Sequence, residues 1–203
     1  DPTADGPTFQ AACERALEKS MTPIRCIEGI RKLRRNGLKI PLVVTTYYNI
    51  PYVNGIGAFL SEIKEAGAQA IIVPDIPVEE ASILLDEGKK SGVHIILQVA
   101  PTTTEERIKK IADVASGFLY VMGVEGVTGA RESLTDSTLK LVSRVRKYTD
   151  LPALAGFGIS KREHAAAVVS AGADGAIAGS AYAEIYEKNL EKPEETLPKI
   201  AQL

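Results

Sequence analysis

Several residue types that mark special classes of protein are scarce in this chain of 203 residues. It has no tryptophan, only two cysteines and only two histidines. The cysteines, Cys13 and Cys26, lie in helix-like segments and are too few for a disulfide framework or a cysteine-based metal site. The histidines, His94 and His164, have no partner at metal-ligand spacing. We therefore predict no metal site and a structural role for both histidines.

Charge of one sign and long apolar runs are also lacking. The formal net charge is −2 and the isoelectric point is near 5.8, and no basic cluster is interleaved with aromatic residues, which argues against nucleic-acid binding. We interpret the basic run at residues 31–35 as the solvated end of a helix. No apolar run is long enough to cross a membrane and no signal peptide stands at the start. We expect a cytoplasmic protein in a reducing compartment, without membrane association.

What is present is a repeated alternation of short apolar runs and helical patterns. With 45% hydrophobic residues, residues 1–203 are long enough for one domain with a sizeable core. The apolar runs are continuous, as in parallel strands buried on both faces, and recur at roughly the spacing of a βα unit. The predicted strands are residues 40–46, 70–73, 94–99, 118–122, 153–155 and 175–178.

Residues typical of helix starts and helix ends support the helices predicted between these strands. Thr103 with Glu106, and Ser160 with Glu163, have the spacing of capping boxes. Residues 66–72 resemble residues 171–177, and each segment has the pattern of a helix end followed by an entering strand. The glycines expected at helix ends are Gly67, Gly92 and Gly172.

Two glycine motifs, residues 154–160 and 176–181, decide between architectures. Each follows an apolar run and opens a helix, where free backbone N–H groups bind phosphate. In a (β/α)8 barrel, phosphate often lies on the loops after strands 7 and 8. We predict an α/β fold, a TIM barrel of which about six of eight strands are present, with the first two strands missing. The alternative, a doubly wound sheet, usually binds phosphate on its first βα turn.

The loop after the fourth predicted strand, residues 123–131, is glycine-rich and has the composition of a mobile lid. Together with six other segments it resembles the tryptophan synthase alpha chain family. The strongest motifs are D-P-x-A-D-G-P at residues 1–7 and G-V-T-G-A at residues 126–130. The other matching segments are residues 47–49, 73–77, 156–160 and 179–181, and Tyr120.

The resemblance implies a lyase that cleaves indole-3-glycerol phosphate to indole and glyceraldehyde 3-phosphate without a cofactor. Such a C–C cleavage needs a proton on indole C3, stabilisation of charge at the indole nitrogen and a base for the glycerol hydroxyl. The family works with a beta subunit, which carries the pyridoxal phosphate. We therefore expect the tryptophan synthase beta subunit as partner.

The resemblance also assigns roles to individual residues. Asp5 would accept a hydrogen bond from the indole N–H, and Tyr120 would reach the substrate from a strand end; the alternatives are a turn or cap residue and a purely structural tyrosine. Gly126 and Thr128 belong to the lid. The expected walls of the indole site are Tyr47, Ile96, Phe157 and Ile159. The expected phosphate ligands are Gly129, Gly158, Gly179 and Ser180. The expected partner contacts are Asp1, Pro2, Asn49 and Pro77.

One departure from the family concerns activity. The family's main proton-transfer residue is a glutamate upstream of the D-P-x-A-D-G-P loop, and these 203 residues contain no counterpart. Asp75 and Glu125 lie on suitable loops, but neither occupies the catalytic position. We expect a polypeptide of these residues to be inactive. Two alternatives stay open: a non-catalytic, phosphate-ligand-binding partner of the beta subunit, or another phosphate-binding barrel enzyme.

Overall fold

The fold is a curled parallel sheet with helices around its outer side. The computed structural model describes residues 5–123, 136–156 and 158–202. Six parallel strands pair in sequence order, from one edge of the sheet to the other, which confirms the predicted strand number and direction. The strands are β1 (Val43–Thr45), β2 (Ala70–Ile72), β3 (His94–Val99), β4 (Leu119–Met122), β5 (Ala153–Gly156) and β6 (Gly175–Ile177).

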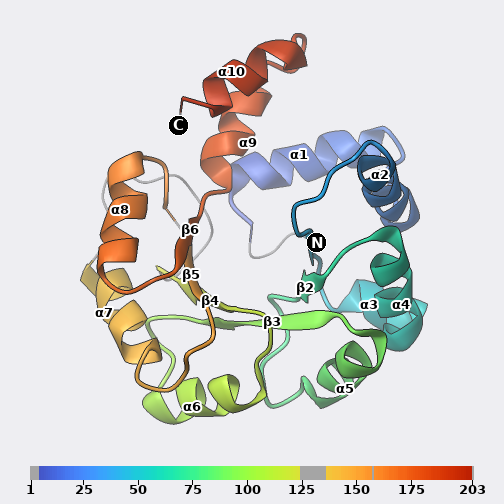
Figure 1. Ribbon diagram of the computed structural model, residues 1–203. Coiled ribbons are helices and arrows are strands. Elements are labelled where there is room, and N and C mark those ends of the chain that lie inside the picture. The colour runs from blue at the N-terminus through green and yellow to red at the C-terminus, as the bar shows by residue number, and fades with distance from the viewer. Residues whose placement is uncertain (1–4, 124–135, 157, 203) are drawn as a thin grey trace.

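The helices that the structure describes lie mostly between successive strands along the chain. Figure 1 shows them arranged around the outside of the sheet, with α1 next to α9. Within the described residues β1 and β6 pair on one side only, so the barrel is open between them. The helices are α1 (Pro7–Glu18), α2 (Pro23–Arg35), α3 (Asn49–Asn54), α4 (Ile56–Ala66), α5 (Ser82–Ser91), α6 (Glu105–Val114), α7 (Asp136–Val145), α8 (Arg162–Ser170), α9 (Ser180–Glu187) and α10 (Thr196–Ile200), preceded by the 3-10 turn η1 (Pro193–Glu195).

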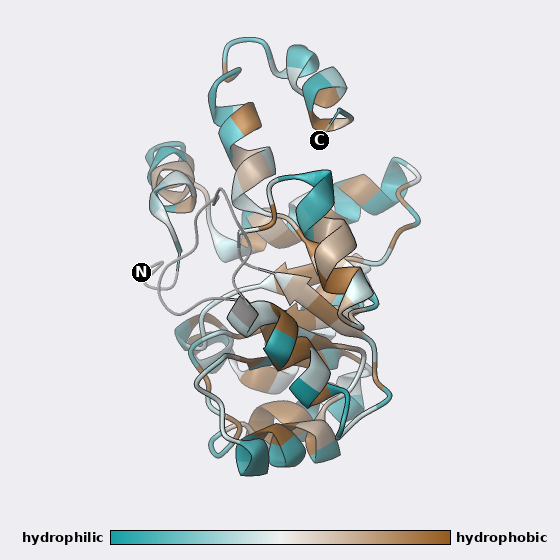
Figure 2. Ribbon diagram, turned by 90° about the vertical axis from the view of Figure 1, so that its left-hand side faces the viewer, coloured by the Kyte–Doolittle hydropathy of each residue, from teal (hydrophilic) through white to brown (hydrophobic). Residues whose placement is uncertain are grey.

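Two apolar clusters lie on opposite faces of the sheet. On β3, Ile95, Leu97 and Val99 join a large cluster between the strands and the helices. Ile96 points to the other face, where it packs with Ala70 and Ile72 and with the rings of Phe118 and Tyr120. The alternation follows from the period of two in a β-strand. Figure 2 shows apolar segments, in brown, gathered around the strands at the centre of the molecule.

At the amino ends of the strands, two arginine side chains, Arg34 and Arg146, bind backbone carbonyl oxygens. We call each of these hydrogen-bond networks an arginine clamp. Arg34 donates to the carbonyl oxygens of Gly67, at 2.7 Å, and of Leu38, at 2.7 Å, and to Gln69 Oε1 at 2.9 Å. Gln69 Oε1 in turn accepts from Leu42 N at 2.8 Å. Arg34 is therefore a structural residue, which corrects, for this residue, the interpretation of residues 31–35 as a solvated helix end.

A second clamp repeats this pattern at the other half of the predicted internal echo. Arg146 donates to the carbonyl oxygens of Gly172 and Leu151, both at 2.8 Å, and to Asp174 Oδ2. That same oxygen accepts from Ala153 N at 2.7 Å. The resemblance between residues 66–72 and 171–177 thus reflects an equivalent hydrogen-bonded corner in two βα units.

Some predicted boundaries are wrong for local reasons. The first strand begins later than residue 40, because the Ile40 carbonyl accepts from Arg34 instead of a neighbouring strand. The cap of α6 is Thr104, which accepts from Arg107 N at 3.3 Å. Thr103 instead accepts from Ala100 N. No side chain caps α8, whose N-cap residue is Lys161, so neither predicted capping box forms.

The predicted helix ends are confirmed. Gly67 and Gly92 cap α4 and α5 with φ of 107° and 66°, and Gly172, one residue beyond the cap of α8, has φ 104°. Glycine adopts this left-handed conformation without the cost that a Cβ imposes. Among the described helices, none is long and apolar enough to cross a membrane.

Candidate active site

A cavity opens at the carboxyl ends of β2, β3 and β4, the end at which barrel enzymes bind their ligands. Its volume is about 370 Å³. The residues after β2, from Val73 to Val78, form one wall, and Gln98 and Met122 contribute from β3 and β4. Ile96, which is 2% exposed, also lines the cavity, as do Leu97 and Ile111 of the outer cluster. The lining therefore combines apolar side chains with polar ones.

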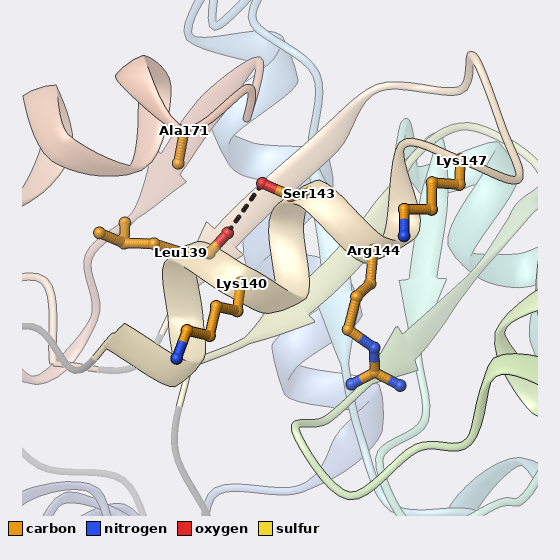
Figure 3. Close-up of a pocket in the computed structure, with 6 residues that line it drawn as sticks. All are labelled: Leu139, Lys140, Ser143, Arg144, Lys147 and Ala171. Carbon is orange, nitrogen blue, oxygen red and sulfur yellow. Dashed lines mark hydrogen bonds between the residues drawn. The ribbon is translucent and has the colours of Figure 1, made fainter.

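A larger groove, of about 490 Å³, lies elsewhere. Figure 3 shows that it is lined from α7 by Leu139, Lys140, Ser143 and Arg144, with Ala171 opposite. In the same view Ser143 Oγ donates to Leu139 O, at 3.3 Å, inside the helix. The groove contains none of the predicted site residues and lies on the helical layer, so we do not place the site there.

Asp5 and Tyr47 come together although 42 residues separate them. The Tyr47 hydroxyl donates a hydrogen bond of 2.9 Å to Asp5 Oδ2. Asp5 lies just before α1, and Gln10 of that helix donates to its carbonyl oxygen at 2.8 Å. Tyr47 follows β1. The two side chains are partly buried, and the contact fixes the direction of the Asp5 carboxylate.

Tyr120 lies on the inner face of β4, in register with Gln98 of β3. Its ring occupies the space that a side chain on Gly156 of β5 would need: a Cβ there would lie 2.4 Å from Tyr120 Cε2 and 2.6 Å from Oη. Burial raises the pKa of Tyr120 from 10 to about 12. The phenol is therefore neutral at physiological pH.

The two predicted phosphate loops lie on adjacent strands. β5 and β6 are neighbours, with Gly156 paired to Ile177. Gly158 has φ +79°, a conformation that favours glycine. Gly179 precedes α9 and Ser180 begins it. Phe9 of α1 lies 3.4 Å from the place of a Cβ on Gly179, so the helix that follows Asp5 packs against the second loop.

Asp75, which lies on a suitable loop but not at the family's catalytic position, has a structural partner. Both of its carboxylate oxygens accept from Tyr48 N, at 2.9 and 3.1 Å. The contact ties the loop after β2 to the loop after β1. Glu125, the other acidic candidate, lies outside the described residues.

The remaining predicted site residues fall into three groups. Ile96 belongs to the inner cluster, whereas Ile159 packs in the outer one, and a contact of either with a ligand stays a prediction. Asn49, after β1, and Pro77, after β2, are both exposed, and the contact of Tyr48 N with Asp75 joins their two segments. Six predicted site residues lie outside the described ranges, as do residues 124–131 of the lid: Asp1, Pro2, Gly126, Thr128, Gly129 and Phe157.

Three contributors were not predicted as site residues from the sequence. Gly156 makes room for Tyr120, Gln98 lines the cavity, and His164 binds the turn after β5. Only the register of the strands could have drawn attention to Gln98. Within residues 5–123, 136–156 and 158–202 no group of three or more His, Cys, Asp or Glu side chains could hold a metal ion.

The family described as tryptophan synthase alpha chain matches residues 1–203. This chain belongs to the tryptophan synthase alpha chain family. It is 49% identical to the alpha chain of Methanocaldococcus jannaschii over 192 residues, 95% of this chain and 68% of that relative. It is 44% identical to that of Methanopyrus kandleri, covering 100% of this chain and 73% of the relative.

Solved structures agree with the family. A structure of the tryptophan synthase α2β2 complex from Pyrococcus furiosus is similar with TM-score 0.91 and 35% identity, over 98% of this chain and 80% of that one. Tryptophan synthase alpha chains are lyases with a TIM-barrel fold, which cleave indole-3-glycerol phosphate in tryptophan biosynthesis. Family membership thus excludes the third reading of the sequence, another kind of phosphate-binding barrel.

Proposed function

We propose that Asp5, Tyr47 and Tyr120 hold the indole part, and the loops after β5 and β6 the phosphate part, of indole-3-glycerol phosphate. Bound there, the substrate would be cleaved to indole and glyceraldehyde 3-phosphate. The observation that carries this proposal is the 2.9 Å hydrogen bond from Tyr47 Oη to Asp5 Oδ2. It places an oriented carboxylate at the carboxyl ends of the strands.

Asp5 would recognise the indole nitrogen. An ionised carboxylate accepts hydrogen bonds at both oxygens, with about four lone-pair directions in all. Tyr47 occupies one direction on Oδ2, and Oδ1 can accept the indole N–H. As the substrate takes a proton at C3, positive charge develops on the ring nitrogen, and the fixed negative carboxylate stabilises it.

Tyr120 would act as a hydrogen-bonding group and not as a base. A pKa of about 12 leaves its proton in place at neutral pH, so the phenol can donate to a substrate oxygen. Its position above Ala70, Ile72 and Ile96 also gives an aromatic ring an apolar floor. Stacking and burial of an indole on such a floor are favourable.

The phosphate would lie between the loops after β5 and β6. Gly158 and Gly179 keep the backbone open to a ligand, and the N-terminus of α9 begins at Ser180. Backbone N–H groups and the helix dipole at such a place favour a phosphate dianion. Gly129 and the lid residues Gly126 and Thr128, which lie outside the described residues, would complete the enclosure.

The partner would be a tryptophan synthase beta subunit docked at the carboxyl ends of the strands. Asn49 and Pro77 are exposed there. On α3, next to Asn49, Tyr52 is 67% and Val53 81% exposed, and exposed apolar side chains in a cluster are typical of an interface. Asp1 and Pro2 would extend it. The reaction needs no cofactor in this chain, and pyridoxal phosphate belongs to the beta partner.

Binding of two fragments tests the assignment of the two halves of the site. Asp5→Ala is expected to weaken binding of an indole-3-alkyl phosphate about tenfold, roughly 1.4 kcal/mol, and to leave glycerol 3-phosphate affinity unchanged. Asp113→Ala, at an exposed aspartate of α6, is the matched control and should bind both ligands normally. Equal loss of both ligands in Asp5→Ala would contradict the assignment.

Turnover is a separate question. At the carboxyl ends of the described strands, Asp5 and Asp75 already accept hydrogen bonds from Tyr47 and from Tyr48 N, and no glutamate corresponds to the family's proton-transfer residue. A polypeptide of these 203 residues should therefore bind the substrate without releasing indole, as a non-catalytic partner of the beta subunit would. Indole release at a rate typical of alpha chains would refute this expectation.

A further inference from the structure

His164 is a buried ionisable side chain that the proposed reaction does not use. It is 7% exposed and lies in the first turn of α8. Its ring points back to the turn that follows β5. Nδ1 lies 3.1 Å from Gly158 O, and it accepts a hydrogen bond of 3.3 Å from Ser160 N.

A single ring nitrogen thus faces both an acceptor and a donor. When Nδ1 carries a proton, it donates to Gly158 O; when it does not, it accepts from Ser160 N–H. Only one of the two bonds can be complete at a time. The ring therefore holds the turn in either of two hydrogen-bonding states, and in the first it does not engage the Ser160 N–H.

Among the described residues, His164 contacts this turn at Gly158 O and Ser160 N, whereas the N-cap residue of α8 contributes no side-chain bond. The N-cap residue of α8, Lys161, makes no side-chain cap, and the capping box expected at Ser160 does not form. Gly158 has φ +79°, so its backbone lacks the restriction that a Cβ provides. On the other side of the turn, Ile159 is buried in the outer apolar cluster. His164 and Ile159 together fix the turn between them.

We propose that His164 is a positioning residue, which holds residues 158–160 in the shape that receives the phosphate group. This inference rests on the proposed function of that turn as half of the phosphate site. Backbone N–H groups bind phosphate well only when their directions are fixed in advance. Loss of the ring nitrogen should therefore lower affinity for a phosphate monoester and leave the Asp5 half of the site unchanged.

Two variants separate the hydrogen bond from the packing. His164→Leu fills much of the same volume without a polar atom, whereas His164→Asn keeps a donor and an acceptor near the place of Nδ1. Titration calorimetry with glycerol 3-phosphate should give about tenfold weaker binding for His164→Leu, and less than about threefold for His164→Asn. Indole affinity, measured in parallel, should stay within twofold of wild type in both, to about 0.4 kcal/mol.

Val168→Ala is the control for a merely structural role. Val168 is fully buried, one helical turn further along the same face of α8. This variant should lower the melting temperature but bind glycerol 3-phosphate as the wild type does. If His164→Leu and Val168→Ala lose the same amount of phosphate affinity at equal loss of stability, His164 only supports the fold and the inference is wrong.

A further variant distinguishes failure of this inference from failure of the proposed function. Gly179→Asp adds a carboxylate at the start of α9, where the place of a Cβ is 3.4 Å from Phe9. If the wild type binds glycerol 3-phosphate, Gly179→Asp abolishes binding and His164→Leu does not weaken it, the phosphate site stands and the role of His164 falls. If the wild type does not bind and Gly179→Asp changes nothing, the proposed phosphate site itself falls.

Discussion

The two ends of the strands use polar groups in opposite ways. At the amino ends, the guanidinium groups of Arg34 and Arg146 donate hydrogen bonds to backbone carbonyl oxygens and to the side chains of Gln69 and Asp174, respectively. At the carboxyl ends, Asp5 accepts a hydrogen bond from Tyr47, and Gln98 lines an open cavity. The polar groups at the amino ends are therefore paired within the chain, whereas those at the carboxyl ends can still form hydrogen bonds with a ligand.

This difference teaches how a barrel separates stability from function. Closed networks stabilise because no buried group is left without a partner. Groups that face a cavity add little to stability, since water solvates them until a ligand replaces it. Substitutions at the amino ends should therefore alter unfolding alone, and those at the carboxyl ends should alter binding, with one exception where a glycine controls packing.

The exception, and the largest expected effect, is Gly156→Ala. The new Cβ would meet Tyr120 Cε2 at 2.4 Å, so the tyrosine ring must move out of the inner cluster. Overpacking of this kind should cost about 3 kcal/mol of unfolding free energy, measured by urea titration, and should abolish ligand binding. Gly29→Ala, on α2 with nothing within 4 Å of its Cβ, is the control and should be at least as stable as wild type.

The second effect is a loss of stability at high pH through Tyr120. Its pKa is about 12 in the folded chain against 10 for an unperturbed tyrosine. Between these values the unfolded chain has released the proton and the folded chain has not, so unfolding free energy falls as pH rises, by up to about 2.7 kcal/mol. Tyr120→Phe should remove this slope. The same slope in wild type and variant would contradict the burial of the phenol.

The third-largest effect, a loss of unfolding free energy, is expected when either arginine clamp is removed. Arg34→Met and Arg146→Met each leave several carbonyl oxygens without their donor, which should lower the unfolding free energy by about 2 kcal/mol. Affinity for glycerol 3-phosphate should not change in either. Arg35→Met, at an exposed position on the same helix as Arg34, should cost almost nothing. A clamp variant with normal stability and weakened binding would break the proposed separation of the two ends.

The smallest effect is expected for Tyr47→Phe. The variant keeps the ring and removes the donor to Asp5 Oδ2, so the carboxylate is less well oriented. Affinity for an indole-3-alkyl phosphate should fall about fivefold, close to 1 kcal/mol, with stability nearly unchanged. Tyr52→Phe, at an exposed tyrosine of α3, is the matched control. An unchanged affinity in Tyr47→Phe would remove Tyr47 from the proposed site.

Much of the fold could be predicted from the sequence because its signals are local. Continuous apolar runs marked the six strands, with β3 correct at both ends, and glycines marked the ends of α4 and α5. The similar segments at residues 66–72 and 171–177 indicated two equivalent corners. The errors were also local. The strand β1 is shorter than predicted because Arg34 binds the Ile40 carbonyl oxygen. The cap of α6 is displaced by one residue, and α8 has no side-chain cap.

The pairings at the candidate site were not predictable in this way. No pattern near Asp5 predicts the contact with Tyr47, and none near Gly156 predicts the contact with Tyr120, because each pair joins segments that only the folded chain brings together. The sequence by itself determined the period of two along β3, the helix stops and the glycine-rich loops, since these depend on neighbouring residues. Only the tertiary structure decided which donor meets which acceptor, as at His164, because that choice depends on register, burial and the space left by residues far away in the chain.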